Sequence, residues 1–136
     1  MLLVLCDPSD LDEDGVVIEV GEVVSRLAVP NVGTYFATGL DESPYRFDQY
    51  ALADPTPGAV LITGRVVAID AIYTAIENVD GHGFSPVPGG ARTVSLTSTA
   101  VSRVSRGYSA LRPHDEDFNG WRFALDTSSV TIDPPT

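Results

Sequence analysis

Residues 59–76, AVLITGRVVAIDAIYTAI, form the longest apolar run of the chain and predict its central strand. The run is rich in β-branched residues, which favour the pleated backbone of a strand. Both of its alternating faces are largely apolar, so we expect a strand that is covered on both sides or curled into a barrel wall. Gly64 is the position at which we expect a bulge or a sharp bend.

Shorter segments with alternating apolar residues predict further strands at residues 1–6, 16–29, 34–38, 91–104 and 121–125. Stretches rich in Gly and Pro separate them, and they predict long loops at residues 39–58, 78–90 and 105–120. About six strands with almost no helix predict a mainly β fold. We expect an antiparallel sheet that closes as a small barrel of the SH3 or OB kind or folds as a sandwich.

The 136 residues are enough for one β-rich domain, residues 1–136, with a core that needs no disulfide. The single cysteine, Cys6, follows an apolar run and is expected to be buried. Arg65 and Asp70 interrupt the longest apolar run, which is therefore too short to span a membrane as a helix. The N-terminus lacks the basic region and the apolar length of a secretory signal, so we expect a cytoplasmic protein.

Acidic residues outnumber basic ones by 19 to 8, which gives a net charge of −11. Nucleic acids and anionic membranes repel such a chain, so we expect neither as a partner. An acidic surface can attract a protein partner with a basic surface, and it also keeps a protein soluble.

The sequence DLDEDG carries the opening pattern of a calcium-binding loop. Asp10, Asp12 and Asp14 alternate, and Gly15 stands at the sixth position, an arrangement that can gather hard oxygen ligands around one ion. The pattern then fails, because the twelfth position, which needs a bidentate Glu, is Gly21. We expect a solvated acidic turn, and we name the three aspartates as the calcium ligands if the turn binds a metal ion.

Two histidines, His82 and His114, lie in different predicted loops. Neither has a spacing typical of zinc ligands, and the chain has no GxSxG elbow, P-loop or dinucleotide-binding fingerprint. We therefore name no catalytic residue and expect no cofactor.

Aromatic residues gather in two of the predicted loops: Tyr45, Phe47 and Tyr50 in the first, and Phe84 in the second. Such rings can line a groove that binds a protein, or they can attach the loops to the core. We name these four residues as candidate partner-binding residues.

Three segments are VGEVV at residues 20–24, GRVVAI at residues 64–69 and PVPGG at residues 86–90, before a strand rich in Thr and Ser. In these segments the chain resembles an uncharacterised family of small actinobacterial proteins, a domain of unknown function. The chain departs from the family near its N-terminus, where the acidic segment replaces a stretch with Trp and Cys. The resemblance implies a compact β domain from an actinobacterium or a phage, and it implies no activity.

The strong negative charge, the aromatic loops and the lack of a catalytic motif favour an acidic protein-interaction module. An immunity, inhibitor or accessory protein would have these properties. One alternative is a structural, self-assembling subunit, such as one of phage origin. A second is a small enzyme that uses a loop histidine.

Overall fold

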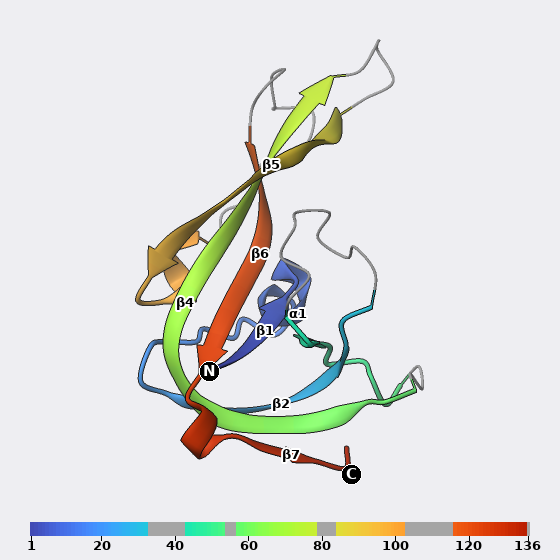
Figure 1. Cartoon of the computed structure of the whole chain (residues 1–136), viewed down its shortest axis with the longest axis vertical. Helices are drawn as coiled ribbons and strands as arrows, with labels where there is room; N and C mark the ends of the chain where they lie inside the picture. The colour runs from blue at the N-terminus through green and yellow to red at the C-terminus, as the bar shows by residue number, and fades with distance from the viewer. Residues whose placement is uncertain (33–42, 54–56, 79–83, 103–115, 136) are drawn as a thin grey trace.

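The computed structural model describes residues 1–32, 43–53, 57–78, 84–102 and 116–135. In these residues the fold is mainly β, with seven strands and little helix (Figure 1). The strands are Leu2–Cys6 (β1), Val23–Pro30 (β2), Tyr45–Phe47 (β3), Val60–Asn78 (β4), Phe84–Leu96 (β5), Glu116–Leu125 (β6) and Thr131–Asp133 (β7). The helical elements are the α-helix Pro8–Asp12 (α1) and the 3-10 turns Thr99–Ser102 and Thr127–Ser129. No helix in the described ranges has the length and apolar character needed to cross a membrane.

Hydrogen bonds join five of the strands into a closed ring. β1 pairs with β6, β6 with β4, β4 with β2, β2 with β3, and β3 with β1. β5 and β7 each pair with β4 outside this ring. The predicted mainly β fold with little helix is confirmed. The pair β1–β3 is parallel, unlike the other pairs, because the chain crosses over through α1 and β2 between these two strands.

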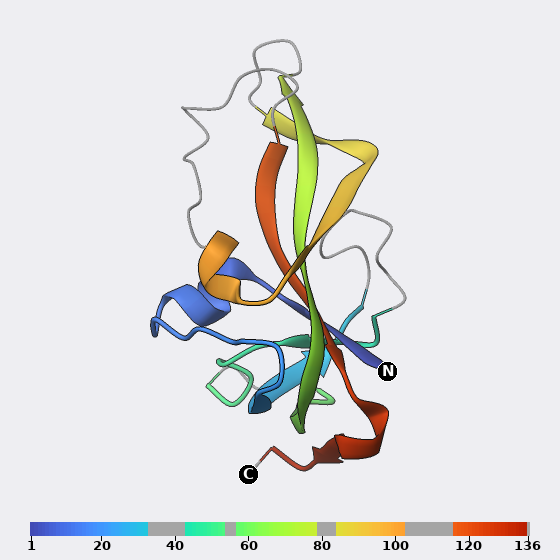
Figure 2. The same cartoon turned by 90° about the vertical axis from the view of Figure 1, so that its left-hand side faces the viewer.

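β4 is the longest strand, with 19 residues, and it serves two regions of the sheet. Its first part pairs with β2 and β7, and its second part pairs with β6 and β5. Figures 1 and 2 show β4 curving past β2 and then rising beside β5 and β6, which extend beyond the ring. The central strand predicted at residues 59–76 is therefore confirmed.

The first bulge of β4 lies at Val67, not at Gly64 as predicted. Gly64 pairs regularly with Val24 on β2, whereas the register with β6 shifts between Val66 and Ala68. One extra residue reverses the alternation of a strand. The fully buried residues are accordingly even-numbered before the bulge and odd-numbered just after it: Ile62 and Val66, then Ile69 and Ala71. This reversal, together with the full burial of Ile72 on the opposite face of β4, explains why both faces of the segment are apolar in sequence.

The main core cluster is formed by apolar side chains from α1 and from all five strands of the ring. Trp121, Phe123 and Leu125 of β6 are fully buried, because alternate residues of a strand lie on one face. The ring centroid of Trp121 lies 5.1 Å from that of Phe118, and the centroid of Phe123 lies 5.9 Å from that of Phe47. The ring of strands is thus filled by large aromatic side chains.

Three predicted loops contain strands. β3 lies within the loop predicted at residues 39–58, β5 begins within the loop predicted at 78–90, and β6 begins within the loop predicted at 105–120. The first part of β5 is predicted as a loop because it contains proline and glycine. An edge strand nevertheless tolerates proline, because one of its edges is unpaired. The strand predicted at residues 34–38 lies outside the described residues.

Gly64 allows neighbouring side chains to pack closely against β4. A β-carbon at this position would lie 3.0 Å from Val130 Cγ2 and 3.3 Å from Leu125 Cδ1.

We expect Gly64→Val to lower the free energy of unfolding by about 1–3 kcal/mol through overpacking, and Gly64→Ala to lower it less. Urea unfolding followed by Trp121 fluorescence measures the difference. Val23→Thr, at an exposed position of the paired strand β2, is the control and should change stability by about 0.5 kcal/mol or less. Unchanged stability of Gly64→Val would contradict the argument.

Candidate functional site

The acidic segment after β1 begins as a short helix. Asp7 caps α1, because its Oδ1 accepts hydrogen bonds from the backbone N–H and the hydroxyl of Ser9 at 2.9 and 2.7 Å. Pro8 occupies the first helical position, which needs no N–H donor. Leu11 is fully buried and attaches α1 to the core. The exposed turn at residues 13–15 therefore follows a helix that is held in place.

Asp10 is a buried carboxylate that joins three segments of the chain. It is 6% exposed, its Oδ2 accepts a hydrogen bond from Arg26 Nη2 on β2 at 3.1 Å, and its Oδ1 accepts one from the backbone N–H of Gln49 at 2.7 Å. Arg26 Nη2 also donates to the backbone oxygen of Asp10 at 3.0 Å. Arg26 alternates with the buried residues Val24 and Ala28, so its charge points inward and needs this acceptor.

A second set of contacts holds the exposed turn at residues 13–15 against residues 48–53. The Oε2 atom of Glu13 accepts hydrogen bonds from the hydroxyl of Tyr50 and from Gln49 Nε2, the latter at 3.3 Å. The bond to the Glu13 carboxylate raises the pKa of the Tyr50 phenol, because it favours the protonated form. Tyr50 is nevertheless 54% exposed, so its ring is available at the surface.

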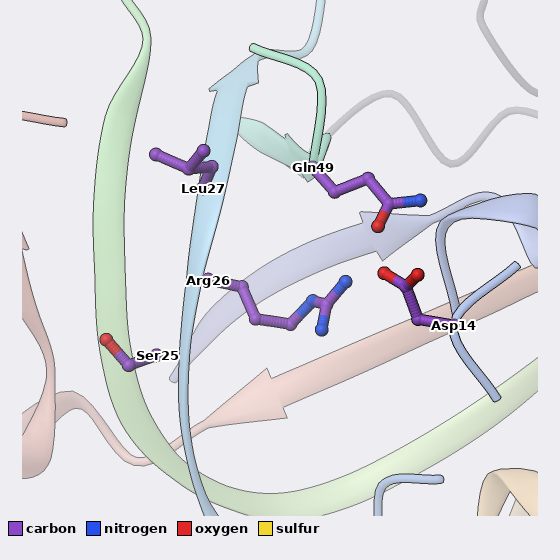
Figure 3. A pocket seen from close by; sticks show the side chains of 5 residues that line it. All are labelled: Asp14, Ser25, Arg26, Leu27 and Gln49. Carbon is purple, nitrogen blue, oxygen red and sulfur yellow. The ribbon is translucent and has the colours of Figure 1, made fainter. Parts of the chain in front are cut away.

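An open pocket of about 250 Å³ lies between the end of α1, β2 and the turn that contains Gln49 (Figure 3). Its lining residues are Asp14, Ser25, Arg26, Leu27 and Gln49. Figure 3 shows the polar ends of Arg26, Asp14 and Gln49 directed toward one another. The pocket thus combines a carboxylate, a guanidinium and an amide in one small space.

The four predicted partner-binding residues have different environments. Tyr45 is half-buried and packs against the core, and Phe47 is 1% exposed, with its ring tilted by 54° relative to that of Phe123 inside the core. Phe47 is therefore corrected from a surface residue to a core residue, because its strand turns the ring inward. Tyr50 is exposed, as a partner-binding residue must be. Phe84 begins β5, and its side chain lies outside the description.

The three predicted calcium ligands do not converge. Asp10 points to Arg26, Asp12 ends α1, and Asp14 lines the pocket. The helix directs its carboxylates to different sides, whereas a calcium-binding loop wraps them around the ion. Within the described ranges, no three His, Cys, Asp or Glu side chains gather as metal ligands.

His82 and His114 lie outside the described residues. The structure therefore assigns neither of them a neighbour or a place in a site. The alternative of a small enzyme that uses a loop histidine stays a prediction.

Arg26 and Gln49 belong to this site although the sequence analysis did not select them. Arg26 could have been selected from the sequence, because a charged residue on the apolar face of a predicted strand is rarely buried without a partner. Gln49 carries no such signal, because its role depends on how the turn at residues 48–53 approaches α1.

No known protein family, curated protein or solved structure matches the chain. The resemblance to the actinobacterial family stays a prediction.

Removal of the Asp10 carboxylate should destabilise the fold. We expect Asp10→Ala to lower the free energy of unfolding by about 2–4 kcal/mol, because it removes the charged acceptor of Arg26, whose side chain is 17% exposed, and the acceptor of the Gln49 backbone N–H. Urea unfolding measures the loss, and Asp14→Ala on the exposed turn is the control, with an expected change of about 0.5 kcal/mol or less. The double variant Asp10→Ala/Arg26→Met should recover part of the loss. Additive losses in the double variant would show that the two side chains are not coupled.

Cys6 should be chemically inert in the folded protein. It is fully buried, and burial, followed by the nearby negative charge of Asp10, raises the pKa of its thiol. At about pH 8 the folded protein should react with iodoacetamide about 100-fold more slowly than the urea-unfolded protein, because only the thiolate is nucleophilic. Mass spectrometry of timed samples measures both rates. Equal rates would mean that Cys6 is accessible in the native state.

Proposed function

We propose that this protein is an acidic interaction module that binds a basic surface of a protein partner. The observation that carries the proposal is the exposed ring of Tyr50 beside the exposed carboxylates of Glu13 and Asp14. We call the surface formed by Glu13, Asp14, Gln49 and Tyr50 the acidic face. Tyrosine is enriched at the energetic centres of protein interfaces, where it combines a large apolar ring with a polar end.

The acidic face is held in place before any partner arrives. Asp10 and Leu11 attach α1 to the body of the protein, and Gln49 connects to both Asp10 and Glu13. A surface whose side chains are already ordered loses less conformational entropy when it binds. This order supports a role in recognition, because an isolated solvated turn would need no such contacts.

The charge of the whole chain supports a basic partner. A net charge of −11 creates a long-range field that speeds association with a positive surface and repels negative ones. We therefore propose neither nucleic acid nor an anionic membrane as a partner. An immunity, inhibitor or accessory protein in the cytoplasm, which covers a basic site of its target, is the biological form that we propose.

A tagged pull-down from the source cell, read by mass spectrometry, tests the proposal. We expect a stoichiometric partner with a basic surface that is released as salt rises from roughly 0.05 to 0.3 M, because salt screens exposed charges. Asp14→Lys should weaken its capture by charge repulsion, and Tyr50→Ala should weaken it by removing the aromatic anchor, at a cost of about 1–2 kcal/mol in binding.

Asp133→Lys is the matched control for Asp14→Lys. It makes the same change of charge at an exposed position of β7, outside the acidic face. Capture should survive this substitution. The proposal fails if no stoichiometric partner appears at either salt concentration, or if Asp14→Lys and Tyr50→Ala both leave capture unchanged.

One observation favours the self-assembling subunit as a second candidate. Among the described strands, β5 pairs with β4 alone, so its other edge presents backbone groups that a second copy could pair with. Light scattering over a range of protein concentrations decides between the two candidates. A monodisperse monomer at high concentration would remove self-assembly.

A further inference from the structure

Two hydrogen-bond acceptors face each other in the pocket beside the acidic face. Gln49 donates through Nε2 to Glu13 at 3.3 Å, and no group of the described residues donates to its Oε1. Figure 3 shows this oxygen directed toward the carboxylate of Asp14. In the part of the chain that the structure describes, the carboxylate of Asp14 has neither a hydrogen bond nor an ion pair. Two converging acceptors are satisfied by a ligand group that carries several N–H donors.

The charges around the pocket select a cation. The positive charge of Arg26 is matched by Asp10, with 3.1 Å between Nη2 and Oδ2. Glu13 receives hydrogen bonds from the neutral groups of Tyr50 and Gln49, and no cationic side chain of the described residues pairs with it. Asp14 adds a further negative charge. Three carboxylates against one guanidinium give these four groups a net charge of −2, which favours a positive ligand over an anion.

The size and the lining of the pocket suit a single side chain. The pocket is open to solvent, has a volume of about 250 Å³, and is lined along β2 by Ser25, Arg26 and Leu27. The aliphatic stem of Arg26 extends along it toward Asp14 (Figure 3). Lysine and arginine place their own aliphatic stems on such surfaces and keep the charged end beside a polar group.

We propose that this pocket receives a single basic side chain, lysine or arginine, from the partner protein. Its ammonium or guanidinium group donates to the carboxylate of Asp14 and to Gln49 Oε1, while Tyr50 contacts the surrounding surface of the partner. The inference rests on the proposed function, since it assigns the residue type that the acidic face recognises.

Small probes test the pocket without the partner. The ¹⁵N-labelled full-length protein is titrated with the N-acetyl methylamides of arginine and lysine, which carry one positive charge each. The corresponding derivatives of glutamine and glutamate serve as neutral and negative controls at constant ionic strength. We expect at least one cationic probe to shift the side-chain amide of Gln49 and the backbone amide of Ser25 saturably, and neither control to do so.

Two isosteric variants, each of which removes one negative charge, then locate the binding site. Asp14→Asn should weaken binding of the cationic probe about tenfold, because it replaces a charge-assisted hydrogen bond by a neutral one. Glu22→Gln removes the same charge at an exposed position that does not line the pocket, and it should leave binding unchanged. Dispersed amide spectra of both variants show that they are folded.

The inference is overturned if neither cationic probe binds saturably, if a control probe binds as tightly, or if Asp14→Asn binds as tightly as the unaltered protein. These results are separable from a failure of the proposed function. A partner that is captured in a salt-sensitive way while the probes do not bind would reject the pocket alone. Probes that bind while no partner is captured would reject the interaction module and retain a site for cations.

Discussion

The fold depends on one strand, β4, which pairs with different neighbours in its two parts. β4 pairs with β2 and β7 in its first part and with β6 and β5 in its second. A regular strand would turn its core side chains toward solvent after bending, because its two faces alternate strictly. The extra residue at Val67 reverses the alternation, so Val66 and Ile69 both remain buried. Closure of the ring depends on this reversal.

The closed ring then sets the position of Arg26, and Arg26 explains the acidic face. Inward side chains of β2 lie in the core, but Arg26 is long enough to reach Asp10 in the middle of α1. A partly buried guanidinium is costly without an acceptor, so Asp10 must lie close to it. The same carboxylate binds the backbone of Gln49, which brings the turn of Tyr50 beside Glu13. The need of Arg26 for an acceptor therefore also holds the acidic face in place.

The site illustrates how acidic residues of one segment acquire different roles. Asp7 caps a helix, Asp10 neutralises a guanidinium, Glu13 holds Tyr50, and Asp14 lines a pocket. Their spacing suggested calcium ligands, but a helical turn separates the side chains that an ion would bring together. A run of carboxylates is thus poor evidence for a metal site until the backbone conformation is known. The carboxylates of Asp7, Asp10 and Glu13 are better explained by the groups that donate to them.

The sequence by itself determined the mainly β fold, the central strand, the buried position of Cys6, and the acidic character of the segment after β1. These features depend on local alternation and composition, which short windows of sequence record. The tertiary structure alone decided the bulge at Val67, the parallel pairing of β1 with β3, the burial of Phe47 and the pocket formed with Arg26 and Gln49. These features depend on contacts between residues far apart in the chain, such as Asp10 with Gln49, and no local pattern encodes which distant partner a side chain meets.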